Sequence, residues 1–279
     1  MDDLTEAKIL VTGATDGLGK RVAFELAGRG ATVLIHGRNR ERLEATIEEA
    51  REETGSEKLG SYLADLSSLG EVRALAEQVL TQQDRLDVLV NNAGVIAGER
   101  RQSEDGYELT FAVNYLAHFL LTRLLVPLLR DSAPARVVNV ASAGQSPIDF
   151  DDVMLERGYD PMRAYTQSKL AQVMFTFELA ERLRDSGVTV NALHPATYMD
   201  TTMLRRASIT PSSSVEEGAE AILNLATSPA LEGRSGLYFN GRREARANGQ
   251  AYDAKARQRL KAISPELTSL SSAPTGSAG

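Results

Sequence analysis

The sequence predicts a doubly wound parallel α/β sheet, with about seven strands and with helices on both faces. Apolar runs of strand length alternate along the chain with longer runs of helical period. The first apolar run ends in a glycine-rich turn that opens a helical segment. The chain has 279 residues, of which 42% are hydrophobic, and such a chain can bury a large core within one domain.

Each strand-like run is apolar and ends near turn residues, which is the pattern of a buried strand. The seven runs lie at residues 7–14, 31–37, 58–66, 86–94, 135–144, 188–196 and 235–241. Helical segments separate most of them, so successive strands are expected to run parallel with helices on both faces of the sheet.

The helical segments combine apolar periodicity with recognisable ends. The first ends at a glycine stop, and the second is charged and amphipathic. The fourth is the most apolar, but Arg123 and Pro127 interrupt it and it is too short for a membrane span, so a core helix is favoured. The five segments lie at residues 18–30, 39–55, 67–83, 107–130 and 162–187.

The sequence shows no internal repeat and no linker, so a single domain is expected over residues 1–263. The last stretch, SPELTSLSSAPTGSAG (264–279), is rich in Ser, Ala, Gly and Pro. This composition cannot bury enough apolar surface to fold by itself, so a disordered tail is predicted.

Composition narrows the class of function. The net charge of −7, from 38 acidic and 31 basic residues, argues against binding to a nucleic-acid backbone. The absence of cysteine excludes disulfides, thiolate chemistry and cysteine-based zinc sites. The N-terminus lacks the basic start and long apolar stretch of a secretory signal, and a cytoplasmic location is expected.

The turn after the first strand, VTGATDGLGK, carries Gly13, Gly17 and Gly19 in the spacing GxxxGxG. Glycine permits a tight turn and lets backbone amides approach a pyrophosphate, which the positive end of the following helix also favours. The motif alone is weak, but here it lies between a strand and a helix in the first βα unit, as in a dinucleotide-binding Rossmann fold.

The end of the second strand indicates which dinucleotide is bound. A ribose with a free 2′-hydroxyl usually meets an Asp or Glu there, but this chain has Gly37 followed by Arg38. A guanidinium can grip a 2′-phosphate with charge-assisted hydrogen bonds, so NADP(H) is expected in preference to NAD(H). The alternative is a solvated arginine at the start of a charged helix.

Six short motifs, in order, resemble those of the short-chain dehydrogenases/reductases, and the resemblance covers roughly residues 7–245. They are TGATDGLG (12–19), ADL (64–66), NNAG (91–94), VNY (113–115), VASAG (140–144) and AYTQSK (164–169). The resemblance implies hydride transfer between a nicotinamide and a small-molecule alcohol or carbonyl, in a homodimer or homotetramer.

The resemblance also assigns residues. The implied catalytic residues are Asn114, Ser142, Tyr165 and Lys169. The implied cofactor-binding residues are Gly13, Thr15, Asp16, Gly17, Leu18, Gly19, Arg38, Asn39, Asp65, Leu66, Asn92, Ala93, Gly94, Tyr165, Lys169 and Pro195. No metal site is expected, because neither the three histidines nor the acidic residues Asp149, Asp151 and Asp152 show metal-ligand spacing.

The segment 148–180 and the motif YFNG (238–241) are similar to the retinol-dehydrogenase-like group of the family. Residues 143–163 and a mobile lid at 197–213 are expected to shape a site for a bulky lipophilic substrate. One departure concerns the Pro-Gly pair that the family has after its sixth strand: this chain has Ala196 there, and neither Thr197 nor Thr201 clearly takes the nicotinamide contact.

Tyr165 and Lys169 are four residues apart, so on a helix they share a face. A phenol of ordinary pKa near ~10 needs about 4 kcal/mol of phenolate stabilisation to reach pKa 7. A cation at about 4 Å supplies roughly that much at an effective dielectric near 20. Tyr165 is therefore the expected general acid or base, tuned by Lys169, with Ser142 donating a hydrogen bond to the substrate oxygen.

Two other classes remain open. A non-catalytic dinucleotide sensor of the same fold would be expected to lack Ser142, Tyr165 or Lys169, and all three are present. A methyltransferase on a similar sheet would need a different glycine loop and a carboxylate after the second strand, where Gly37 and Arg38 stand.

Overall fold

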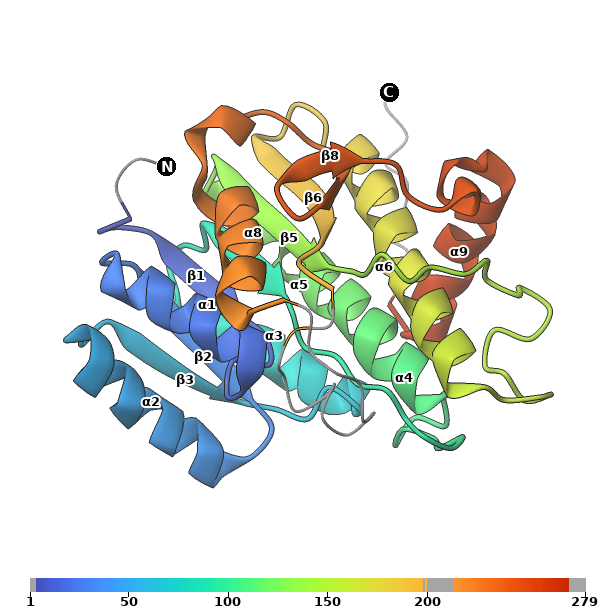
Figure 1. Ribbon diagram of the computed structural model, residues 1–279, viewed down its shortest axis with the longest axis horizontal. Helices are drawn as coiled ribbons and strands as arrows, with labels where there is room; N and C mark the ends of the chain where they lie inside the picture. The colour runs from blue at the N-terminus through green and yellow to red at the C-terminus, as the bar shows by residue number, and fades with distance from the viewer. Residues whose placement is uncertain (1–3, 198, 200–212, 271–279) are drawn as a thin grey trace.

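The structure is a computed structural model, and it describes residues 4–197, 199 and 213–270 (Figure 1). One sheet of eight strands has the order β3-β2-β1-β4-β5-β6-β7-β8. The strands are β1 (Lys8–Val11), β2 (Thr32–Gly37), β3 (Leu59–Leu63), β4 (Val88–Asn91), β5 (Ala135–Val140), β6 (Val188–His194), β7 (Leu237–Asn240) and β8 (Arg243–Ala245).

All neighbouring strands pair in parallel except the last two, β7 and β8, which are antiparallel. The predicted doubly wound parallel sheet is confirmed. The strand beyond the expected seven, β8, is an edge strand of three residues. A run of three polar and small residues is too short for periodicity to reveal it.

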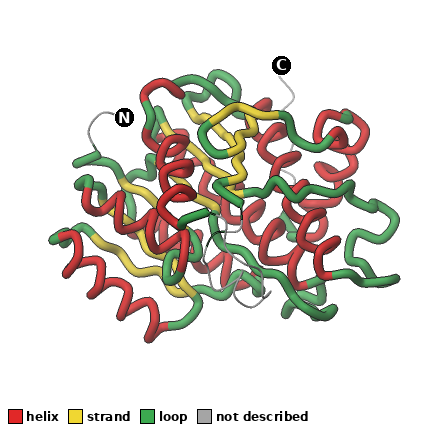
Figure 2. Tube along the Cα trace, viewed as in Figure 1, coloured by secondary structure: helices red, strands yellow, loops and turns green. Residues whose placement is uncertain are grey.

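Helices cover both faces of the sheet (Figure 2). One face carries α1 (Gly17–Gly28), α2 (Arg40–Thr54) and α8 (Val215–Thr227). The other carries α3 (Leu69–Gln82), α4 (Leu109–Phe111), η1 (Ala112–Leu116), α5 (Ala117–Asp131), α6 (Pro161–Arg182) and α9 (Ala254–Leu267). Two short 3-10 turns, η2 (Pro229–Leu231) and η3 (Gly249–Tyr252), follow α8 and β8. Among all the helices, α8 and α9 lie outside the five predicted helical segments.

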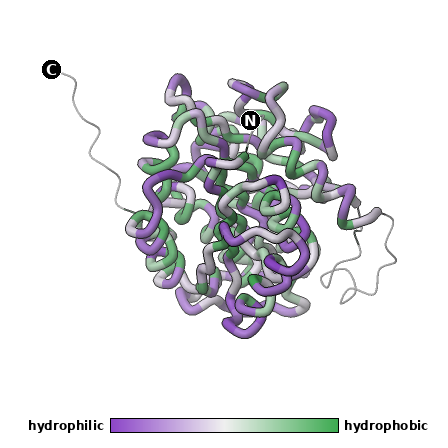
Figure 3. Tube along the Cα trace, turned by 90° about the vertical axis from the view of Figure 1, so that its left-hand side faces the viewer, coloured by the Kyte–Doolittle hydropathy of each residue, from purple (hydrophilic) through white to green (hydrophobic). Residues whose placement is uncertain are grey.

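The apolar core forms two clusters, one on each face of the sheet. Successive strand residues alternate between them: Ile9 and Val11 pack with the α1 and α8 side, whereas Leu10 packs with the α3 and α5 side. All three are completely buried. Figure 3 shows hydrophobic segments inside and hydrophilic segments toward the outside.

The helical stretch Leu109–Asp131 is apolar and long enough to cross a bilayer by length and composition, but 78% of its most apolar window is buried inside the protein. Side chains such as Leu120 and Leu125 are fully covered by the core. Burial on this scale is the pattern of a core helix, as predicted for this segment.

The predicted boundary of the tail at residue 264 is wrong, because α9 continues to Leu267 and the chain is described to Leu270. Ser264 is fully buried, and its hydroxyl lies 2.6 Å from the hydroxyl of Tyr115 in η1. Arg73 of α3 also donates to the carbonyl of Ser269. Composition cannot reveal such anchors. Residues 271–279 lie outside the described residues.

Candidate active site

The predicted site residues gather at the carboxyl ends of the parallel strands. The strand order reverses between β1 and β4, which are neighbours in the sheet although two strands separate them in sequence. In open parallel sheets a crevice forms at such a reversal, and ligands bind there. The glycine turn follows β1, NNAG includes the end of β4, and Ser142 follows β5.

The glycine turn packs closely on the residues that follow β4 and leads into α1. Gly13 has φ +64° and Gly17 has φ +50°, a left-handed conformation that favours glycine. A Cβ on Gly13 would lie 2.8 Å from the Cα of Ala93, and one on Gly19 would meet the carbonyl of Gly13. No side chain caps α1 at Asp16, so its first N–H groups face the turn. Thr15 lies within this turn, and Leu18 lies in the first turn of α1.

Thr12 and Asn92 tie the glycine turn to the end of β4. The Thr12 Oγ1 accepts hydrogen bonds from the backbone N–H groups of Asn92 (2.9 Å) and Ala93 (3.1 Å). The Asn92 Nδ2 donates to the carbonyls of Thr12 (2.9 Å) and Gly13 (3.3 Å). The two sequence motifs thus form one rigid floor. Asn92 and Ala93 are predicted site residues, whereas the role of Thr12 could not be predicted from its motif.

His36, another residue that sequence reasoning missed, holds the same turn from β2. Its Nδ1 accepts from the Gly13 N–H at 3.1 Å, and its Nε2 lies 3.1 Å from the carbonyl of Ala64. This arrangement places the proton on Nε2, because Nδ1 must carry a lone pair. Burial lowers the pKa of His36 to about 4, so the ring is neutral at pH 7.

The end of β2 carries no carboxylate and presents an exposed arginine. A Cβ on Gly37 would collide with the Thr15 side chain, so Thr15 fills the place of a carboxylate. Arg38 is exposed, and its side chain forms no hydrogen bond or ion pair within the described part of the chain. Asn39 instead caps α2, its Oδ1 accepting from the Arg42 N–H at 2.9 Å.

Asp65 and Leu66 follow β3, beside the Ala64 carbonyl that His36 contacts. One carboxylate oxygen of Asp65 accepts from the Ser67 N–H at 2.9 Å, and Leu66 is buried. Asp65 is half-buried, so its other carboxylate oxygen can meet a base at this edge. The residues from Gly13 to Asp65 therefore fit a dinucleotide with its pyrophosphate at α1 and its adenosine beyond β2.

Ser142 and Tyr165 meet beyond the end of β5. Tyr165 lies in the second turn of α6, which begins at Pro161 after the cap residue Asp160. Ser142 is nearly buried, and its Oγ accepts from the Gly144 N–H at 3.1 Å. Burial raises the pKa of Tyr165, and a hydrogen bond to the Ser142 side chain partly offsets this.

Lys169 lies one turn after Tyr165 on the same face of α6. Its Nζ donates to the carbonyl of Val140 (2.8 Å) and to the Gln172 Oε1 (2.9 Å), and it lies 5.6 Å from the centre of the Tyr165 ring. Burial lowers the pKa of Lys169 to about 7. The net shift of the Tyr165 pKa is therefore upward and not downward as expected: both groups are desolvated, and the loss of water favours their neutral forms.

Asn114 is the centre of a short π-helix, η1. Its Oδ1 accepts from the Val95 N–H at 2.8 Å, and its Nδ2 donates to the Val95 carbonyl (3.1 Å) and the Ser168 Oγ (3.0 Å). Ser168 also donates to the Tyr165 carbonyl at 2.7 Å, a local hydrogen bond within α6. Asn114 thus joins the end of β4 to the catalytic helix. π-Helical turns often mark functional sites.

Gly94 lies between the floor that Thr12 and Asn92 form and the predicted catalytic residues Asn114 and Lys169. A Cβ there would lie 3.4 Å from the Asn114 Oδ1 and 3.7 Å from the Lys169 Nζ. Pro195 follows β6 and is buried, and the Thr197 Oγ1 lies 2.9 Å from the His194 Nε2. The predicted lid at 197–213, including Thr201, lies almost wholly outside the described residues.

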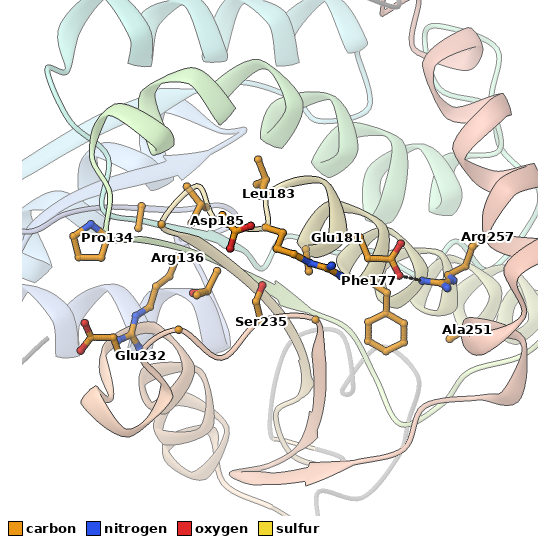
Figure 4. Close-up of a pocket in the computed structure, with 18 of the residues that line it drawn as sticks. Pro134, Arg136, Phe177, Glu181, Leu183, Asp185, Glu232, Ser235, Ala251 and Arg257 are labelled. Carbon is orange, nitrogen blue, oxygen red and sulfur yellow. Dashed lines mark hydrogen bonds and ion pairs between the residues drawn. The ribbon is translucent and has the colours of Figure 1, made fainter. Parts of the chain in front are cut away.

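A cavity of about 840 Å³ lies away from this site. Pro134, Val188 and Gly236 line it, so it opens at the amino ends of β5, β6 and β7, opposite the catalytic edge (Figure 4). An ion pair of Arg257 with Glu181 (2.8 Å) crosses it.

The three acidic residues between positions 149 and 152 each form an ion pair with an arginine. Asp149 pairs with Arg163 (3.0 Å), Asp151 with Arg259 (2.9 Å) and Asp152 with Arg157 (3.6 Å). These pairs connect the loop before α6 to α6 and α9 and within itself.

The reversal in strand order, the glycine turn and the Ser-Tyr-Lys cluster define a dinucleotide-dependent oxidoreductase. The family model for short-chain dehydrogenases matches residues 7–211. Retinol dehydrogenase 13 of Mus musculus is 40% identical over 282 residues, covering 95% of this chain and 84% of that protein. The chain belongs to the short-chain dehydrogenase/reductase family, within its retinol-dehydrogenase-like group.

Solved structures agree. A protein of Mycobacterium paratuberculosis has a TM-score of 0.78 at 30% identity, covering 96% of both chains. A short-chain dehydrogenase of Shigella flexneri, solved with NADP, has a TM-score of 0.69 at 28% identity, covering 87% of this chain and 99% of that one. The protein is an NAD(P)-dependent oxidoreductase that acts on CH–OH groups, as predicted.

Proposed function

We propose that the protein interconverts a bulky lipophilic alcohol and its carbonyl compound with NADP(H), using Tyr165 as the general acid or base. The observation that carries the proposal is that Ser142, Tyr165 and Lys169 lie beside the floor formed by the glycine turn and Asn92, where the strand order of the sheet reverses. When bound, the nicotinamide supplies or accepts the hydride.

The protein residues supply the proton and the orientation. For reduction, Tyr165 donates its phenolic proton to the substrate oxygen while Ser142 donates a second hydrogen bond to it. For oxidation, Tyr165 accepts the hydroxyl proton. Lys169 is fixed by Val140 and Gln172, so it can take up charge beside the phenol without moving.

The replacement Tyr165→Phe tests the catalytic role. Turnover of a panel of aldehydes and ketones, followed by NADPH absorbance, is expected to fall by about 10²- to 10⁴-fold, the usual contribution of general acid–base catalysis. The Kd for NADPH should stay within about threefold, because the phenol proton is not a major coenzyme contact. A Tyr62→Phe control removes a buried phenol on β3 that accepts from Gln83, and should leave turnover unchanged. Turnover preserved in Tyr165→Phe would favour a sensor.

The preference for NADP(H) is proposed from Arg38, which is exposed and has no partner among the described residues, and from Gly37, where no carboxylate can repel a phosphate. Arg38→Gln is expected to weaken NADPH binding by about 10- to 100-fold, the worth of one charge-assisted hydrogen bond. NADH binding should change little. Arg40→Gln is the matched control, since Arg40 is also exposed but pairs with Glu44. Equal loss for both coenzymes would contradict the role of Arg38.

The substrate class is proposed from two observations. The retinol dehydrogenases that the chain resembles are named for a lipophilic alcohol. Met162, one turn before Tyr165 on α6, keeps 52% of its surface exposed, which leaves apolar surface on the helix that carries the phenol. Retinal and long-chain aldehydes should therefore show a lower KM than small aldehydes. A panel in which KM does not fall with apolar size would count against this class. The homo-oligomer and the cytoplasmic location stay predictions.

A further inference from the structure

The backbone of Ser142 lies past the last hydrogen bond that this segment makes to β6. The last sheet-like contact of this chain segment is the Ala141 N–H, which donates to the Leu193 carbonyl at 2.8 Å. The carbonyl of Ser142 instead accepts from two side chains: the Tyr238 hydroxyl at 2.9 Å and the Gln145 Nε2 at 2.7 Å. Tyr238 comes from β7, two strands away in the sheet.

The same C-terminal region holds the rest of the loop that follows Ser142. The Gln145 Oε1 accepts from the Asn248 N–H at 2.9 Å. Three residues further, the Ile148 N–H donates to the Gln250 Oε1 at 2.7 Å, and the Gln250 Nε2 returns a bond to the Ile148 carbonyl at 3.2 Å. Residues 142, 145 and 148 are therefore held by groups between residues 238 and 250, while Ser146 between them bonds to Thr166 of α6.

We propose that Tyr238 is a positioning residue for catalysis: its hydroxyl fixes the Ser142 carbonyl, and thereby aims the Ser142 Oγ at the Tyr165 phenol. The inference rests on the proposed function, in which Ser142 and Tyr165 act on the substrate. Tyr238 is 4% exposed, so it is placed to act through Ser142 rather than on the substrate.

The chemistry of Tyr238 suits a permanent donor. Burial raises its pKa to about 12, so its hydroxyl keeps its proton at every pH at which the enzyme works. The groups that face Tyr165 are Ser142 from the end of β5, Lys169 from α6 and, at longer range, Tyr238 itself. Of these, Ser142 is the one that lowers the pKa of Tyr165 through a hydrogen bond, so moving Ser142 raises that pKa.

The test compares Tyr238→Phe with Tyr62→Phe, which removes a similarly buried hydroxyl with one hydrogen-bond partner from β3, outside the loop that follows Ser142. Tyr238→Phe is expected to lower kcat about tenfold, the value of one buried hydrogen bond, with the Kd for NADPH within about twofold of wild type. The midpoint of the pH–rate profile for alcohol oxidation should move to higher pH. Tyr62→Phe should keep both kcat and the midpoint.

The Ser142→Ala background decides whether Tyr238 acts through Ser142. There, adding Tyr238→Phe should lower kcat no further, because no Oγ remains to be aimed. A full tenfold loss in that background, or wild-type kcat for Tyr238→Phe beside a lowered kcat for Ser142→Ala, would overturn the inference and leave the proposed function standing. A Ser142→Ala enzyme with wild-type kcat would remove the role of Ser142 and this inference with it, whereas the proposed function fails if Tyr165→Phe keeps its turnover.

Gln145→Leu supplies a second route, since Gln145 is half-buried in the loop and its loss spares the β7 core. It should reproduce the lower kcat and the higher midpoint if Tyr238→Phe folds poorly. A Gln145→Leu enzyme with both values unchanged would contradict the idea that the Ser142 carbonyl must be held.

Discussion

Acid should destabilise this protein through His36, which the structure holds as a neutral ring between the glycine turn and the end of β3. The pKa of His36 falls from 6.5 to about 4 because the ring is buried. Between these values the unfolded chain binds a proton that the native protein does not, so stability is full above pH 6.5 and is lost as pH falls toward 4. From pH 7.5 to pH 5 the loss attributable to His36 is about 2 kcal/mol.

The assay is urea denaturation at pH 7.5 and pH 5 for wild type and His36→Asn. An Asn can still accept from the Gly13 N–H through its Oδ1, but it cannot titrate. Burial also lowers the pKa of His118 to about 3 and lowers that of His194, so both proteins lose stability in acid. The loss in His36→Asn should be smaller than that of wild type by about 2 kcal/mol. Tyr62→Phe, whose substitution adds no group that titrates in this window, should lose as much as wild type.

If wild type and His36→Asn lose the same free energy of unfolding between the two pH values, the imidazole is not the buried neutral acceptor described above. A difference of the opposite sign would mean that a protonated His36 stabilises the fold, which needs an acidic partner close to the ring.

Three other changes follow from the same structure. Ser264→Ala should lower the free energy of unfolding by about 1–3 kcal/mol in urea titrations, because the buried Tyr115 hydroxyl loses its partner. Gly94→Ala should weaken NADPH binding about tenfold in fluorescence titrations, with a Tm near that of wild type, because the added methyl fits beside Asn114 and Lys169 but rises into the coenzyme floor. Met162→Ser should raise KM severalfold for long-chain aldehydes and leave it unchanged for small ones, since it removes exposed apolar surface one turn before Tyr165 on α6.

The sequence was sufficient for the sheet and for the edge that carries the site. Glycine spacing, NNAG and the Tyr165–Lys169 pair each follow or accompany a strand, and parallel strands bring their carboxyl ends to one edge. Local patterns failed where partners are remote in sequence. Nothing near His36 reveals that its ring contacts residues 13 and 64, and nothing near Tyr238 reveals a bond to residue 142.

The same limit applies to the electrostatics of Tyr165. Helical spacing places Lys169 beside it, and a charged neighbour at that distance would depress the pKa of the phenol. Spacing says nothing about burial, which here lowers the pKa of Lys169 to about 7 and raises that of Tyr165. The sequence therefore predicted a lowered pKa for Tyr165, on the assumption of one charged neighbour in a partly solvated site, whereas the pKa in the folded site is raised.

This burial makes the two groups act as a pair. Near neutral pH a protonated Tyr165 stands beside a Lys169 that is close to losing its own proton. Ionising the phenol alone would bury a lone negative charge, whereas a phenolate with an adjacent ammonium buries a neutral pair. Loss of the Tyr165 proton must therefore raise the pKa of Lys169, and the two titrate with shared, macroscopic pKa values. The pH–rate profile of a Tyr238→Phe or Gln145→Leu enzyme then reports on the pair, because Ser142 stabilises its phenolate member.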